Sequence, residues 1–256
     1  MPGSSAHKPS TDGFFFWMSV VLLAMVVAGF VPSFYLRPLT ENDALPTHLV
    51  VHGVVLSAWF IWFVLQTGLV RLGYRSLHRR MGIIGAAIGI ACVFAGPLAT
   101  LTAIRSMLDS GLDWDTDMSA DPARGIEGIT MAQFGPALVL GNIASTFAFA
   151  GLLFFALKHR QRADIHRRLM LLASISFIGP AISRIARWPV FGGEDGPFIP
   201  VAFASLLIAM ALHDWRTLGR LHGATVAGSA ALTGLLVLSL IVSATPIGLA
   251  VARLLA

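Results

Sequence analysis

Three histidines of this 256-residue sequence occur in similar surroundings and are the first candidates for chemistry. His78 and His166 each precede two arginines, and both, like His222, stand where a long apolar segment begins. Imidazole is a common ligand of zinc, copper and iron, and it also binds haem iron. Asp214 follows the end of another apolar segment and can act as a fourth ligand or orient an imidazole. The pattern predicts a site for b-type haem or a divalent metal (zinc, iron or copper) at these four residues.

A second pattern runs through the second long apolar segment. His52, Trp59 and Gln66 follow one another at steps of seven residues, which is two helical turns, so they share one helix face. We expect this seam to line an inner cavity together with Asn142 of a later segment, or to serve helix packing alone. His48 and His52 form an H-x-x-x-H pair, but the pair lacks the glutamate that metalloproteases carry after the first histidine.

Arg184 stands inside an apolar segment, shortly after Gly179-Pro180. An arginine at this depth is costly unless it reaches the membrane surface or pairs with an anion. It either extends outward past Arg187 or meets an anionic group, such as a haem propionate or a lipid head group. Arg184 and His52 therefore join the cofactor-binding candidates. Gly179-Pro180 and Gly96-Pro97 are both expected to kink their helices.

The composition shows what kind of chain must position these residues. Apolar residues make up 56% of the sequence and charged residues 12%, about half the fraction usual in soluble domains. The mean hydropathy is +0.77. This composition excludes a soluble enzyme, a disordered chain and a nucleic-acid-binding domain. The single cysteine, Cys92, excludes a disulfide framework and a cysteine-based zinc or iron–sulfur site.

Seven segments are long and apolar enough, or nearly so, to cross a hydrocarbon core of about 30 Å. We therefore predict an all-α integral membrane protein, with a polar tail over residues 1–13 and one seven-transmembrane-helix bundle over residues 14–256. The sixth segment is the shortest. The predicted spans are Phe14–Leu36, His48–Leu72, Met81–Ile104, Phe134–Leu157, Leu169–Trp188, Phe198–Leu212 and Ala224–Ala252.

The loop charges predict an orientation. Twelve of the 18 Lys and Arg lie in the tail and in or beside the loops after the second, fourth and sixth spans. Ten of the 13 acids lie on the other side, several of them in a loop over about residues 106–130. Because basic loops stay in the cytoplasm, we expect a cytoplasmic N-terminus and an outer, in bacteria periplasmic, C-terminus. The net charge of +5 is then a topology signal and not the footprint of a nucleic-acid partner.

Several segments of the chain, taken together, match the pattern of one protein family. They are Phe34–Leu39, His52-Gly53, Trp59, Gln66-Thr67, Leu77–Gly82, Asp164–Met170, Arg184, and Asp214 with His222. This set resembles a widespread uncharacterised family of bacterial multi-pass membrane proteins, a domain of unknown function with His-Arg-Arg span starts. The resemblance covers most of the chain, roughly from Gly29 to Pro246. It implies a location in the bacterial inner membrane and implies no activity.

The residues leave three functions open. The first is a redox or electron-transfer protein that binds a metal or haem, similar to transmembrane cytochromes b and haem A synthases. The second is a zinc-dependent intramembrane hydrolase of lipid amides or esters, similar to alkaline ceramidases and adiponectin receptors. Those proteins carry an H-x-x-x-H pair in the last span, where this chain has only His222. The third is a non-catalytic membrane subunit or assembly factor. We favour the first, with the lipid bilayer and a small apolar or lipid ligand as the expected partners.

Overall fold

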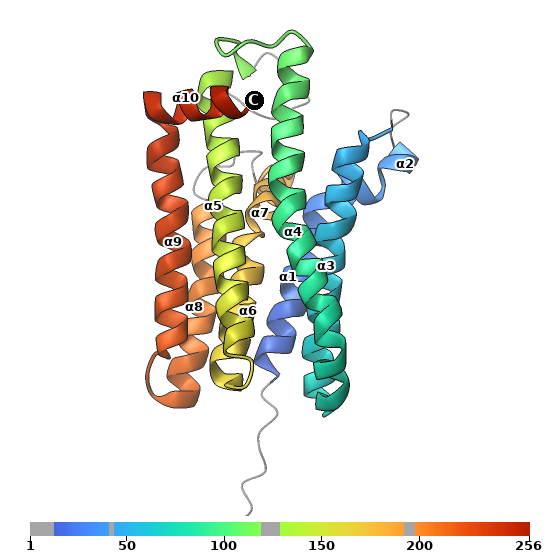
Figure 1. Cartoon of the computed structure of the whole chain (residues 1–256), viewed down its shortest axis with the longest axis vertical. Coiled ribbons are helices and arrows are strands. Elements are labelled where there is room, and N and C mark those ends of the chain that lie inside the picture. Colours follow the sequence, from blue (N-terminus) through green and yellow to red (C-terminus); the bar gives the residue numbers. More distant parts are fainter. Residues whose placement is uncertain (1–12, 41–43, 119–128, 192–197) are drawn as a thin grey trace, which may run out of the picture.

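The computed structural model describes residues 13–40, 44–118, 129–191 and 198–256. Within these ranges the chain is helical, apart from turns and one isolated bridge between Asp117 and Thr130. The long helices run up and down along a common direction and form one bundle (Figure 1). The protein is thus an all-α multi-pass membrane bundle, as the sequence predicts.

Ten α-helices and two short helices of other types are described, in the following order. They are α1 (Phe14–Phe30), the π-helical η1 (Val31–Tyr35), α2 (Arg37–Thr40), α3 (Thr47–Arg71), α4 (Arg75–Asp109), α5 (Met131–Lys158), α6 (Ala163–Ser176), α7 (Gly179–Ala186), the 3₁₀-helix η4 (Pro189–Phe191), α8 (Phe198–Leu218), α9 (Gly223–Ser243) and α10 (Pro246–Leu255).

The fifth predicted span is broken in two. Six helices of the described chain are long and apolar enough to cross a membrane, and α6 with α7 makes a seventh span that bends by 48°. The break falls at Gly179-Pro180, because Pro180 has no N–H to continue the hydrogen bonds of α6 and instead starts the first turn of α7. The kink predicted there is confirmed, whereas α4 continues as one helix through Pro97.

The seventh predicted span, Ala224–Ala252, is longer than the helix that the structure contains there. Helix α9 ends at Ser243, and α10 turns away and packs across α5 (Figure 1). Thr245 caps α10 by accepting from the Gly248 N–H at 3.3 Å, and Pro246 occupies the first turn. The turn requires glycine at 248, since a Cβ there would lie 2.2 Å from the Val242 carbonyl oxygen. The apolar composition of α10 concealed this turn in the sequence.

The basic loops gather at one end of the bundle, which we call the basic end. It contains the start of α1 and the loops Leu72–Tyr74, His159–Arg162 and Gly219–His222 (Figure 1). Gly73 and Gly219 adopt φ of +87° and +67° in two of these tight turns, a conformation that favours glycine. The C-terminus and α10 lie at the opposite end, the far end (Figure 1). The two ends match the charge sorting of the sequence, and the cytoplasmic assignment of the basic end stays a prediction.

The bundle has a dense apolar interior and an apolar exterior. Trp59, Phe149 and Ile175 of α3, α5 and α6 are buried in the core. On the outside, Ile83 and Phe94 of α4 are 80% and 69% exposed. An apolar outer surface of this extent is what contact with lipid requires. The core therefore holds the helices in place around the polar groups that lie among them.

Candidate functional site

Two of the predicted histidines meet at the basic end. His78 lies in the first turn of α4 and His166 in the first turn of α6, and each of these helices begins after a short loop. Their ring centroids are 6.4 Å apart and the ring planes are inclined by 70°. Both side chains are half-buried. The recurring His-Arg-Arg motif thus brings two imidazoles side by side, which shared depth alone did not establish.

The His166 ring is held in one orientation by the preceding helix. Its Nδ1–H donates to the Ala156 carbonyl oxygen of α5 at 2.9 Å. Because a carbonyl oxygen only accepts, the proton of the neutral ring is on Nδ1 and the lone pair is on Nε2. Metal-binding histidines commonly have their second nitrogen fixed by a backbone carbonyl in this way.

The His78 side of the pair contains polar groups that lack partners. Within the described chain, His78 Nδ1 is buried without a hydrogen bond, and so are both amide atoms of the Gln66 side chain. The backbone of Gln66 also lies against the His78 ring. Each unsatisfied buried polar group costs about 1–3 kcal/mol, and such groups in a native fold call for a bound water, an ion or a functional role. A bound water or ion would satisfy these atoms of Gln66 and His78.

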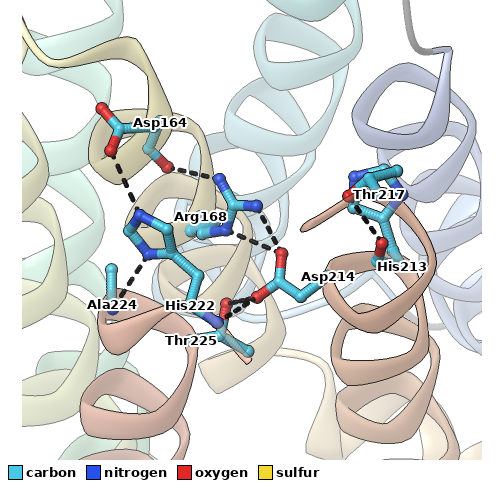
Figure 2. A network of polar contacts seen from close by, with 8 residues as sticks. All are labelled: Asp164, Arg168, His213, Asp214, Thr217, His222, Ala224 and Thr225. Atoms are coloured by element: carbon cyan, nitrogen blue, oxygen red, sulfur yellow. Dashed lines mark hydrogen bonds and ion pairs between the residues drawn. The ribbon is translucent and has the colours of Figure 1, made fainter. Parts of the chain in front are cut away.

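Asp214 is engaged in a different network (Figure 2). Its Oδ1 accepts from Arg168 Nε at 2.9 Å and from Arg168 Nη2. Its Oδ2 accepts from the Thr225 hydroxyl and from the His222 backbone N–H, the latter at 3.1 Å. Asp214 and Arg168 are both fully buried. The carboxylate is thus saturated by groups from α6 and from the start of α9.

His222 belongs to the same network (Figure 2). Its Nδ1 accepts from the Ala224 N–H at 3.1 Å and so caps α9. Its Nε2 donates to Asp164 Oδ2 at 3.1 Å, and the Asp164 carbonyl in turn accepts from Arg168 Nη1 at 2.8 Å. Both ring nitrogens of His222 are thus engaged within the protein. We name Asp164, Arg168, Asp214, His222 and Thr225 the basic-end clamp.

The structure therefore divides the four predicted ligands. It brings His78 and His166 together, and it places His222 and Asp214 in the basic-end clamp. In the described ranges no three histidine, cysteine or acidic side chains converge as a metal-binding group. Arg168, the centre of the clamp, was missed as a site residue. The sequence offers one indication of this role for Arg168: a buried acid in one apolar span requires a cation from another.

The α3 seam lies against neighbouring helices, with Trp59 and Gln66 buried. Trp59 Nε1–H donates to the Ser174 hydroxyl at 3.2 Å, and His52 Nδ1–H donates to the Ala95 carbonyl at 3.2 Å. Asn142 lies elsewhere, in a cavity between α4, α5 and α10. The seam thus contacts α4 and α6 directly, and Asn142 lines a separate cavity.

Arg184 and His52 both lie toward the far end, in α7 and near the start of α3. The Arg184 guanidinium lies 4.3 Å above the centroid of the Phe30 ring and donates to the Pro180 carbonyl at 3.2 Å. Phe34, four residues after Phe30, packs on Gly53 beside His52. The predicted cofactor-binding residues thus divide between the two ends of the bundle, with His78 and His166 at one end and His52 and Arg184 toward the other.

No protein-family model matches this chain, and no curated protein and no solved structure is significantly similar to it.

Proposed function

We propose that this protein binds one transition-metal ion between His78 and His166, either as a free ion or as the iron of a b-type haem, and that the metal serves a redox or electron-transfer role. The observation that carries the proposal is the approach of the two rings to 6.4 Å between centroids. The fixed Nδ1–H of His166 adds to it, because it leaves Nε2 as a ligand atom.

The spacing of the rings suits one shared ion. A metal–imidazole bond is about 2 Å long, and the ring centre lies about 1 Å beyond the nitrogen, so two bonds in line join centroids about 6 Å apart. The observed separation of 6.4 Å between the His78 and His166 centroids is close to this value. Two imidazoles are also the usual axial ligand set that holds a b-type haem between helices.

The unsatisfied groups beside the pair support the same site. Gln66 offers an amide oxygen and an amide nitrogen, both buried and without a partner in the described structure. A water bound to the metal would donate to that oxygen, and so would satisfy a group that otherwise destabilises the fold. Gln66 is then a positioning residue for the remaining coordination positions.

We also propose that the membrane is the cytoplasmic membrane of a bacterium and that the basic end faces the cytoplasm. The clustering of the basic loops supports this orientation, since such loops are retained on the cytoplasmic side. The bacterial location is what the sequence resemblance of the His-Arg-Arg span starts implies. The metal would then lie near the cytoplasmic face.

The geometry favours this function over lipid hydrolysis. A catalytic zinc takes three protein ligands and leaves a fourth position for water. The two other residues predicted for such a set, His222 and Asp214, are engaged in the basic-end clamp. The third function, a non-catalytic subunit, becomes one outcome of the experiment that follows.

The test is an absorption spectrum and an elemental analysis of the same purified sample, in wild type and in His78→Ala, His166→Ala and His159→Ala. We expect near-stoichiometric metal or a Soret band in wild type and a loss of at least tenfold in the first two variants. His159→Ala should retain the wild-type content, because His159 lies in the loop at the same end and outside the pair. Wild type without metal or haem after supplementation, or equal content in all variants, would overturn the proposal.

A further inference from the structure

Arg184 contacts no carboxylate among the residues that the structure describes. In the described structure it makes no ion pair, and its one hydrogen bond goes to the carbonyl of Pro180 in its own helix. The Phe30 ring covers one side of the guanidinium. Arginine has five N–H donors, so most of them stay available to a ligand. A half-buried guanidinium in an apolar span is costly without an anion, which makes it a candidate binding site.

His52 reaches the same region through η1, because Phe34 of η1 packs on Gly53 beside His52, and Phe30, just before η1, faces Arg184. The Nδ1–H of His52 is committed to the Ala95 carbonyl, so Nε2 is the nitrogen that is left for a ligand. Neither of the ion pairs between described residues involves Arg184 or His52. An anionic ligand would therefore supply the counter-charge that Arg184 lacks among the described residues.

The backbone around these side chains is closely packed and holds them in place. A Cβ on Gly29 would lie 2.7 Å from the Ala181 carbonyl oxygen, so α1 and α7 are in direct contact beside Phe30 and Arg184. A Cβ on Gly53 would lie 2.4 Å from the Phe34 ring, so η1 presses on α3 next to His52. π-helical turns such as η1 often occur at functional sites. In this turn the Ser33 hydroxyl is buried without a partner in the described residues.

We propose that Arg184 and His52 bind one anionic group, a phosphate or a carboxylate, at the far end of the bundle. The guanidinium supplies parallel N–H donors that match two oxygens of the anion. Nε2 of His52, when protonated, donates to a third position. The source is either the head group of an anionic lipid or a small water-borne anion. This site is independent of the proposed metal pair, which lies at the opposite end.

The test titrates delipidated protein in a neutral detergent with three probes: phosphatidylglycerol, inorganic phosphate and acetate, with chloride holding the ionic strength constant. Binding is measured as a saturable rise in Tm, and bound lipid is counted by native mass spectrometry. We expect Arg184→Gln to weaken binding at least tenfold. We expect the affinity of Arg184→Lys to lie between those of wild type and Arg184→Gln, because lysine keeps the charge but lacks the parallel N–H donors of the guanidinium. His52→Gln should weaken binding by a smaller factor.

Arg253→Gln is the matched control. Arg253 lies in α10 at the same end and also faces an aromatic ring, at 5.7 Å from the Trp114 centroid, but it is exposed. Its replacement should leave binding unchanged. Saturation by the lipid alone identifies a head group, and saturation by phosphate or acetate identifies a water-borne anion. The proposal is overturned if no probe saturates, if Arg184→Gln binds as wild type does, or if Arg253→Gln loses as much as Arg184→Gln. Metal content, measured on the same samples, reports separately on His78 and His166.

Discussion

Arg168 donates from both Nε and Nη2 to one carboxylate oxygen of Asp214, and the two side chains are fully buried where α6 meets α8. The second oxygen of Asp214 binds the first residues of α9. One carboxylate thus joins three helices at the basic end. In an apolar bundle such a pair acts mainly by fixing which helix faces meet, because burying the two charges offsets much of their attraction.

Breaking this pair on one side should destabilise the protein strongly. Asp214→Leu leaves the Arg168 guanidinium buried and unpaired, so we expect a loss of about 3–5 kcal/mol in the free energy of unfolding. Arg168→Met should cost a similar amount. The double variant should recover most of the loss, since both charges are then gone. Unfolding in detergent, followed by circular dichroism, measures all three, and additive losses in the double variant would contradict the pairing.

His222→Ala should separate a structural histidine from a ligand. The change removes the cap of α9 and the contact with Asp164, so we expect a loss of about 0.5–2 kcal/mol. Metal or haem content should stay at the wild-type level, because both ring nitrogens are engaged inside the protein. The two readouts are a Tm and an elemental analysis. A fall in metal content as large as that of His166→Ala would instead make His222 a ligand, as the sequence pattern suggests.

Gly248→Ala tests the turn between α9 and α10. The added Cβ would lie 2.2 Å from the Val242 carbonyl oxygen, so the two helices must move apart, and we expect a loss of about 1–3 kcal/mol. Gly234→Ala is the control, since a Cβ there meets no atom within 4 Å and alanine favours a helix by up to about 1 kcal/mol. Thermal unfolding in detergent distinguishes the two. Equal Tm values for both variants would show that the turn tolerates a side chain.

The apolar runs were sufficient to predict an all-α bundle, because a chain with this hydropathy has few other ways to satisfy its backbone. The breaks within spans were less predictable. Gly179-Pro180 was recognised as a kink, but the turn before Pro246 lay inside a continuous apolar run. Loop charges placed His78, His166 and His222 at one depth. Which of these histidines meet depends on the rotation of each helix and on which helices are neighbours. Neither can be read from the pattern of a single sequence.

The clamp shows the same limit at the level of side chains. Asp214 was predicted as a ligand because a carboxylate near histidines suits a metal. In the structure Asp214 pairs with Arg168 and not with a metal-binding histidine. Arg168 comes two residues after His166 and lies on another face of α6. Two residues along a helix are about 200° apart. His166 therefore contacts α4 and α5, whereas Arg168 reaches α8. Assigning ligands from the sequence therefore requires knowing which face of α6 meets which helix.

Gln66 should affect stability and metal content in opposite directions. Both of its amide atoms are buried and lack partners in the described structure, so Gln66→Leu removes an unsatisfied group, and we expect the metal-free protein to gain about 1 kcal/mol. If the protein binds metal as proposed, the same change also removes the acceptor for a metal-bound water, and outer-sphere partners of this kind are worth about 10–100-fold in metal affinity. Asn142→Leu is the control, because its amide oxygen is also buried without a partner but lies in the cavity beside Leu255. It should change Tm and leave metal affinity unaltered.

If Gln66→Leu binds metal as tightly as wild type, Gln66 is a packing residue of the α3 seam and the metal is held by the two histidines alone.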